Sequence, residues 1–214
     1  MTTIKHHLTD DLLMGYSAGT LPEAVNLIVA THISMCDECR AALGSYDALG
    51  GAVLSETTVD DMQVDLAATL ALIQAETAQP RAEMKPVASD VPAPLAGYIG
   101  GSLSDVKWRS VGMGVKQAIL PTSAEASARL LFIPAGAAVP DHSHNGLELT
   151  LVLQGAFEDE EDRFQRGDIE IANEDIHHMP VADISEDCIC LAVTDAPLKF
   201  RGLIPRLAQP FLRI

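Results

Sequence analysis

The chain has 214 residues, which exceeds one typical domain and predicts two. Hydrophobic residues make up 48% of it and only 12 residues are proline, so packed cores are expected and a largely disordered protein is excluded. The net charge of −16 argues against direct nucleic-acid binding, because phosphate binding needs clustered Lys and Arg. An acidic surface suits a basic partner protein instead.

The start of the chain carries no secretory signal, and no apolar run approaches the roughly 20 residues of a membrane helix. We therefore expect a cytoplasmic protein without a membrane partner. Thiols stay reduced in that compartment, so the four cysteines favour metal binding or redox chemistry over disulfides.

Four short helices are predicted in residues 1–78. Thr9 precedes two aspartates and reads as the N-cap of the first helix. A second helix is expected from Pro22 toward Cys39, a third over residues 40–49, and a break at Gly50 and Gly51. The fourth, over residues 59–77, would either pack in the bundle or bury its apolar stripe against a partner.

His32, Cys36 and Cys39 form an H-x3-C-x2-C pattern. If the second helix continues through them, positions i, i+4 and i+7 lie on one stripe, so three zinc ligands converge. The fourth ligand would be His6 or His7, which point in opposite directions in an extended arm, and we favour His7. A redox cysteine pair or plain core residues are the alternatives.

Residues 79–95 contain four prolines and read as a linker. Beyond them, short apolar runs at residues 128–133, 148–153 and 187–193 predict strands. The acidic run at residues 158–162 is expected to form a solvated turn. Cys188 and Cys190 would share one face of a strand, either as oxidation sensors or as small core residues.

A second ligand pattern, G-x5-H-x-H-x3-E-x6-G, begins at Gly136 and contains His142, His144 and Glu148. It matches the first sequence motif of cupin barrels at every defining position. The second motif is less complete, but it supplies His178 as a fourth ligand. Three imidazoles and one carboxylate suit Zn²⁺, Mn²⁺, Fe²⁺ or Ni²⁺. A cupin that has lost its metal is the alternative.

The segments HHLTDDLL at 6–13 and YSAGTLPEA at 16–24, followed by the H-x3-C-x2-C pattern, resemble the zinc-binding anti-sigma family, in particular its ChrR-type branch with an appended cupin. The resemblance covers about residues 4–78. It implies that His7, His32, Cys36 and Cys39 bind Zn²⁺ and that the helical domain sequesters a group IV (extracytoplasmic-function, ECF) sigma factor.

The predicted fold is therefore α+β with several parts. An all-α zinc-binding domain (1–78) and a Pro-rich linker (79–95) precede an all-β cupin barrel, or jelly roll (96–200), and a C-terminal tail (201–214). The predicted function is inhibition of transcription, with the cupin metal site answering a small-molecule or oxidant signal. A metal-dependent cupin enzyme, of the dioxygenase or isomerase type, is the alternative.

Overall fold

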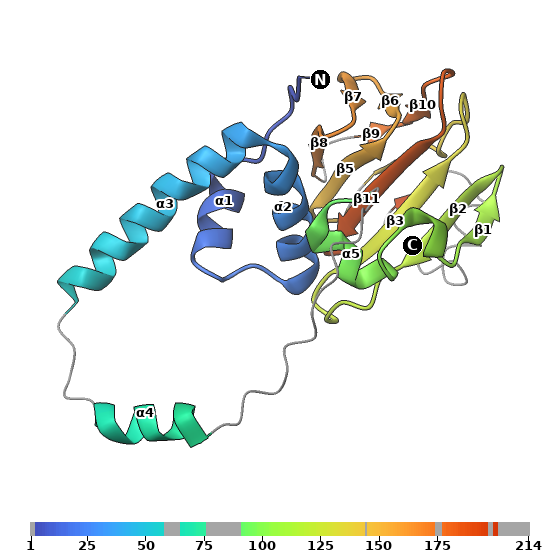
Figure 1. Cartoon of the computed structure of the whole chain (residues 1–214). Helices are drawn as coiled ribbons and strands as arrows, with labels where there is room; N and C mark the ends of the chain where they lie inside the picture. Colours follow the sequence, from blue (N-terminus) through green and yellow to red (C-terminus); the bar gives the residue numbers. More distant parts are fainter. Residues whose placement is uncertain are drawn as a thin grey trace.

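The computed structural model describes residues 3–57, 65–75, 91–143, 145–173, 177–196 and 199–200. Helices come first and strands follow, as the sequence predicts (Figure 1). The helices are α1 (Asp10–Ser17), α2 (Glu23–Met35), α3 (Asp37–Glu56), α4 (Leu66–Ala75) and α5 (Ala93–Ile99), and a short 3-10 turn covers Leu103–Asp105.

The start of α1 confirms the predicted cap. The Thr9 side chain accepts a hydrogen bond from the backbone N–H of Leu12, and Asp10 and Asp11 occupy the first turn. Leu12 and Leu13 are buried, so the apolar face of this helix points into the core.

The second predicted helix is shorter than expected. α2 ends at Met35, and Cys36 has an extended backbone (φ −108°, ψ 110°) that separates it from α3. The Cys36 thiol accepts from the N–H of Cys39 and so caps α3. The prediction of a single helical stripe is therefore wrong, because the chain turns at Cys36.

The predicted break at Gly50 and Gly51 is also wrong, since α3 runs through both glycines to Glu56. Glycine weakens a helix by only about 1 kcal/mol, and neither glycine has a positive φ. The predicted linker also ends too late: Pro92 caps α5, and Leu95 in that helix is fully buried. The first part of that linker lies outside the described residues.

Three antiparallel sheets form the second half of the chain. The largest has the order β1-β2-β3-β11-β5-β8, and the others are β10-β6-β7 and β12-β4-β9. The strands are β1 (Arg109–Gly112), β2 (Val115–Ile119), β3 (Ser127–Ile133), β4 (His142–Ser143), β5 (Glu148–Gln154), β6 (Ala156–Glu158), β7 (Arg163–Gln165), β8 (Ile169–Ala172), β9 (His177–His178), β10 (Val181–Ala182), β11 (Cys188–Thr194) and β12 (Lys199–Phe200).

Strands β5 and β11 are buried on both faces along nearly their whole length, which explains their nearly continuous hydrophobic runs. In β11, Cys188 and Cys190 point into the barrel interior, whereas Ile189 and Leu191 point to the opposite face. This alternation follows the two-residue period of a strand. The three strands predicted at 128–133, 148–153 and 187–193 are confirmed as β3, β5 and β11.

The outer face of the large sheet is covered by α2 and α5 (Figure 1). One apolar core joins the two halves of the chain: Ile28 of α2 and Leu95 of α5 belong to the same buried cluster as Leu149 and Leu191 of the sheet. Residues 3–8, which we call the N-terminal arm, also reach the barrel. Their amide groups bond near the start of β8.

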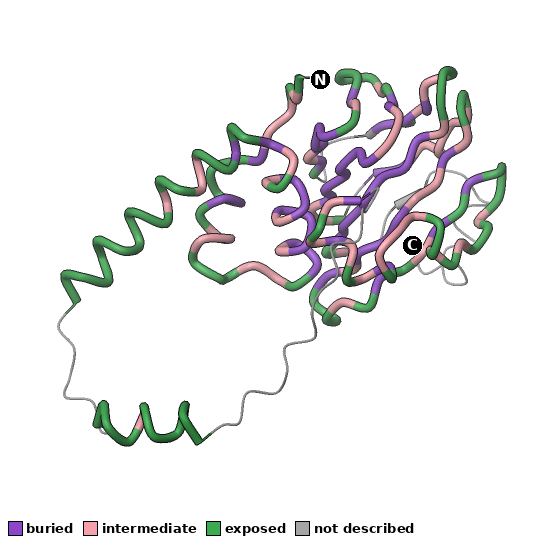
Figure 2. Tube along the Cα trace, in the orientation of Figure 1, coloured by how far each residue is buried: buried purple, intermediate pink, exposed green. Residues whose placement is uncertain are grey.

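Most residues of α4 and of the C-terminal half of α3 are exposed (Figure 2). The C-terminal half of α3 exposes Leu49, Val53 and Leu54. None of the residues of α4 is buried, and Leu72 is 70% exposed. Figure 1 places α4 apart from the other helices. Met62, predicted on this fourth helix, lies outside the described residues. Within the described part of the chain, none of the helices is long and apolar enough to cross a membrane.

Candidate metal centres

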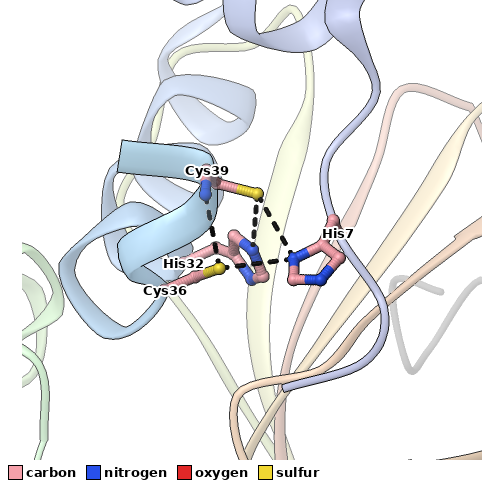
Figure 3. A group of neighbouring side chains, drawn as sticks. All are labelled: His7, His32, Cys36 and Cys39. Atoms are coloured by element: carbon pink, nitrogen blue, oxygen red, sulfur yellow. Dashed lines mark hydrogen bonds between the residues drawn. The ribbon is translucent and has the colours of Figure 1, made fainter. Parts of the chain in front are cut away.

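The arm, the end of α2 and the start of α3 bring four side chains together, which we call the helical cluster (Figure 3). These are His7, His32, Cys36 and Cys39, and their ligand atoms all lie within 4.8 Å of one another. His7 Nδ1 lies 3.3 Å from the Cys36 sulfur and 3.7 Å from the Cys39 sulfur. His32 Nε2 lies 3.3 Å from the Cys39 sulfur.

The donor set of the helical cluster fits zinc. Zinc prefers four tetrahedral nitrogen and sulfur ligands at about 2.0–2.3 Å, and such a tetrahedron has edges of about 3.3–3.8 Å. The three separations above fall within that range. The second nitrogen of His7, Nε2, lies 3.3 Å from Glu38, an arrangement that orients metal-bound imidazoles in other proteins.

Burial favours the uncharged forms of His32 and Cys39 in this cluster. The pKa of His32 is lowered to about 4, first by burial and then by the neighbouring His7. Burial, with the nearby Cys36, raises the pKa of the Cys39 thiol to about 11. A neutral imidazole is ready to donate an electron pair, whereas the thiol must release its proton to a metal. Metal binding and proton release are therefore linked here.

His6 and His7 point in different directions, as expected for neighbours in an extended arm. His7 joins the helical cluster. His6 instead packs on Phe164, with ring centroids 4.3 Å apart, and its Nε2 lies 3.2 Å from Asp162. Both histidines were candidates for the fourth zinc ligand from the sequence, and in the structure only His7 lies beside the other three residues of the helical cluster.

A second group, the barrel cluster, lies among the strands of the cupin-like half. It consists of His142 on β4, Glu148 at the start of β5 and His178 on β9, all buried. The Nε2 atoms of the two histidines are 3.2 Å apart, and His142 Nε2 is 3.8 Å from the Glu148 carboxylate. Two imidazoles and a carboxylate fit a divalent metal. His144, the fourth predicted ligand, lies outside the described residues.

The remaining nitrogens of both barrel histidines are held by oxygens. His142 Nδ1 lies 2.9 Å from the Pro140 carbonyl. His178 Nδ1 lies 2.7 Å from Glu170 and 3.0 Å from Asp159. These contacts leave the Nε2 atoms facing the cluster, in the manner of carboxylate–histidine–metal arrangements.

Asp159 and Glu170 are parts of this centre that the sequence analysis missed. The acidic run was expected to be a solvated turn, but the Asp159 side chain is fully buried and faces His178. Its other oxygen accepts from the N–H groups of Glu161 and Asp162, which explains the turn. Burial raises the pKa of Glu170 to about 7, although His178 opposes that shift. What distinguishes these two carboxylates from the other acidic residues is their contact with His178, which no local sequence pattern indicates.

Cys188 and Cys190 are buried neighbours with sulfurs 3.5 Å apart. Their place in the barrel core agrees with the reading as small core residues. The pKa of Cys190 is raised well above its usual value by its contact with Cys188 and by burial, so the thiol form is favoured.

Comparisons with known proteins agree with this architecture. Residues 98–198 match the family model of the ChrR cupin-like domain. The anti-sigma-E factor ChrR of Cereibacter sphaeroides is 57% identical over 213 residues, covering 99% of this chain and 100% of that protein. A crystal structure of Rhodobacter sphaeroides SigE in complex with the anti-sigma ChrR matches with a TM-score of 0.79 and 57% identity, covering 90% of this chain and 99% of that chain.

Identity of this level over nearly the whole chain exceeds what a shared cupin fold alone would produce. It spans both the helical half and the barrel half, and both candidate metal centres. The resemblance inferred from the N-terminal motifs is thereby confirmed. The chain belongs to the ChrR family of anti-sigma factors.

Proposed function

We propose that this chain binds an ECF-type sigma factor and keeps it from engaging core RNA polymerase. The observation that carries the proposal is the 57% identity, over nearly the full length, to a protein seen in complex with SigE. Sequestration needs no chemical turnover, which suits a regulatory protein. Its place of action would be the cytoplasm, where sigma factors meet the polymerase.

The exposed apolar side chains of α3 and α4 support a protein partner. A large apolar surface left in water is unfavourable and is typical of an interface. Leu54 is 76% exposed, and Leu66, Leu72 and Ile73 on α4 are each more than 60% exposed. Residues 1–85 contain 12 acidic and 4 basic residues, a net charge of −8. This negative charge complements the basic surface that a partner needs to bind nucleic acid.

The metals assigned here are Zn²⁺ in the helical cluster and a second divalent ion in the barrel. His7, His32, Cys36 and Cys39 would hold the zinc, which would fix the arm against the ends of α2 and α3. His142, His144, Glu148 and His178 would hold the barrel metal. Residues 1–78 would then form the sigma-binding part, and the cupin-like half from α5 onward would form the part that answers a signal.

Binding to purified Rhodobacter sphaeroides SigE tests the proposal directly. The full chain should bind it, and Leu72→Glu should weaken binding at least tenfold, because a charge would replace an apolar contact on α4. Ile184→Glu is the matched control, since Ile184 is 86% exposed on the barrel. Equal binding by both variants would remove α4 from the interface, and absence of binding by the parent chain would refute the proposal.

A further inference from the structure

The N-terminal arm is bound to the barrel through one buried carboxylate. The Asp168 side chain is fully buried at the turn before β8. Its Oδ1 accepts the backbone N–H groups of Lys5, at 2.6 Å, and His6, at 3.0 Å. Its Oδ2 accepts the N–H of Gln165 at 2.9 Å. Two of these three donors therefore come from the arm, more than 160 residues away in sequence.

Further contacts seat the arm along the same turn. The Gln165 side chain donates to the carbonyl of Thr3, at 3.1 Å. Gly167 has a φ of +95°, and a Cβ atom added there would lie 2.7 Å from Ile4. A larger residue at 167 would displace the Ile4 side chain, and glycine also adopts this positive φ without strain. We call this set of contacts the clasp.

The next residue along the arm is His7, a member of the helical cluster. His7 comes from the extended arm, whereas the other three members lie on α2, on α3 or at the one-residue turn between them, so the position of His7 depends on what fixes the arm. Holding that segment in advance reduces the entropy lost when a metal is bound. A buried carboxylate is also strongly unfavourable unless donors satisfy it, which favours the closed clasp.

We propose that Asp168 of the barrel is a positioning residue for the helical metal site, which it serves by clasping the arm that carries His7. This rests on the proposed zinc site and adds that the barrel half contributes to its affinity. Among the described residues, the Asp168 carboxylate makes no hydrogen bond to a ligand atom of the cluster, although its charge interacts with His32. It acts through the arm, and it lies two residues before Glu170, which contacts His178 of the barrel cluster.

Cobalt titration of the full-length protein tests the proposal, because cobalt bound to thiolates absorbs characteristically and, of the two clusters, the helical cluster is the one that contains cysteines. Asp168→Asn keeps the side-chain shape but replaces one acceptor oxygen with an amide. We expect its cobalt affinity to fall by about 10- to 100-fold, the effect typical of residues that support metal ligands. The spectrum at saturation should match the parent protein, since all four ligands remain.

Asp162→Asn is the matched control, because Asp162 is 65% exposed and contacts His6 only at its ring. Its cobalt affinity should stay within about twofold of the parent, since it leaves the Asp168 contacts intact. Ile4→Ala removes an arm contact of the clasp without changing a buried acid. It therefore tests the clasp if Asp168→Asn does not fold. It should also weaken cobalt binding.

Hydrogen exchange of the metal-free chain gives a second readout. The amides of Lys5 and His6 should be protected in the parent and exchange faster in Asp168→Asn. Parent-like cobalt affinity in folded Asp168→Asn, or in Ile4→Ala where the former does not fold, would overturn the clasp while leaving the metal site intact. Absence of the thiolate–cobalt signal in the parent chain would instead overturn the metal site, and the clasp with it.

Discussion

Replacing Cys39 by serine is the sharpest test of the helical cluster. Cys39 is buried at the first turn of α3, and its sulfur lies within 3.7 Å of the donor nitrogens of both His7 and His32. The Cys39 sulfur contacts a ligand from the arm and a ligand from α2. Its loss should therefore uncouple all three segments.

The size of the effect follows from the energy of structural zinc. Such sites contribute about 10–16 kcal/mol to small zinc domains, which averages to roughly 2.5–4 kcal/mol for each of four ligands. That energy corresponds to a loss of zinc affinity on the order of 10²- to 10³-fold. Serine is smaller and harder as a ligand than a thiolate, so it should recover little of the loss.

The assay is competition for zinc against a chelator, followed by binding to SigE. Cys39→Ser should lose both zinc and sigma binding, because the inhibitory surface depends on the folded helical part. Cys188→Ser is the control, since it makes the same chemical change in the barrel core. If Cys39→Ser bound SigE as the parent does while lacking zinc, the proposed role of the metal would be wrong.

Three further outcomes are expected. His7→Ala should lose zinc as Cys39→Ser does, and His6→Ala should retain it, because only His7 lies in the cluster. Competition for zinc against a chelator measures both variants, and the reverse ranking would contradict the choice of His7. Glu170→Gln should weaken metal binding in the barrel by about 10- to 100-fold, because it removes the carboxylate that orients His178. Calorimetry should show an unchanged metal affinity for Glu186→Gln, the control at an exposed position. Leu95→Ala should destabilise the chain by about 2–5 kcal/mol in urea unfolding, since Leu95 is fully buried between α5 and the sheet; a change below about 1 kcal/mol would contradict this packing.

Much of the secondary structure followed from local patterns. The Thr9 cap and the strands β3, β5 and β11 occur as predicted, because capping and apolar periodicity depend on nearby residues. Predictions failed where neighbours in space outweighed local preference. Cys36 leaves the helix, where it caps α3 and joins the helical cluster, and Gly50 remains helical although glycine is a weak helix former.

The ligand types and their spacing predicted the residues that the structure brings together in the two clusters, because both are properties of the sequence itself, and metal binding by them stays a prediction. Only the tertiary structure brought Asp159 and Glu170 to His178, and Asp168 to the arm. These carboxylates look like any other surface acid in the sequence, since nothing local marks them as buried. The contacts of Asp159 and Glu170 depend on how the barrel strands pair, and those of Asp168 depend on how the distant N-terminal arm packs against the barrel.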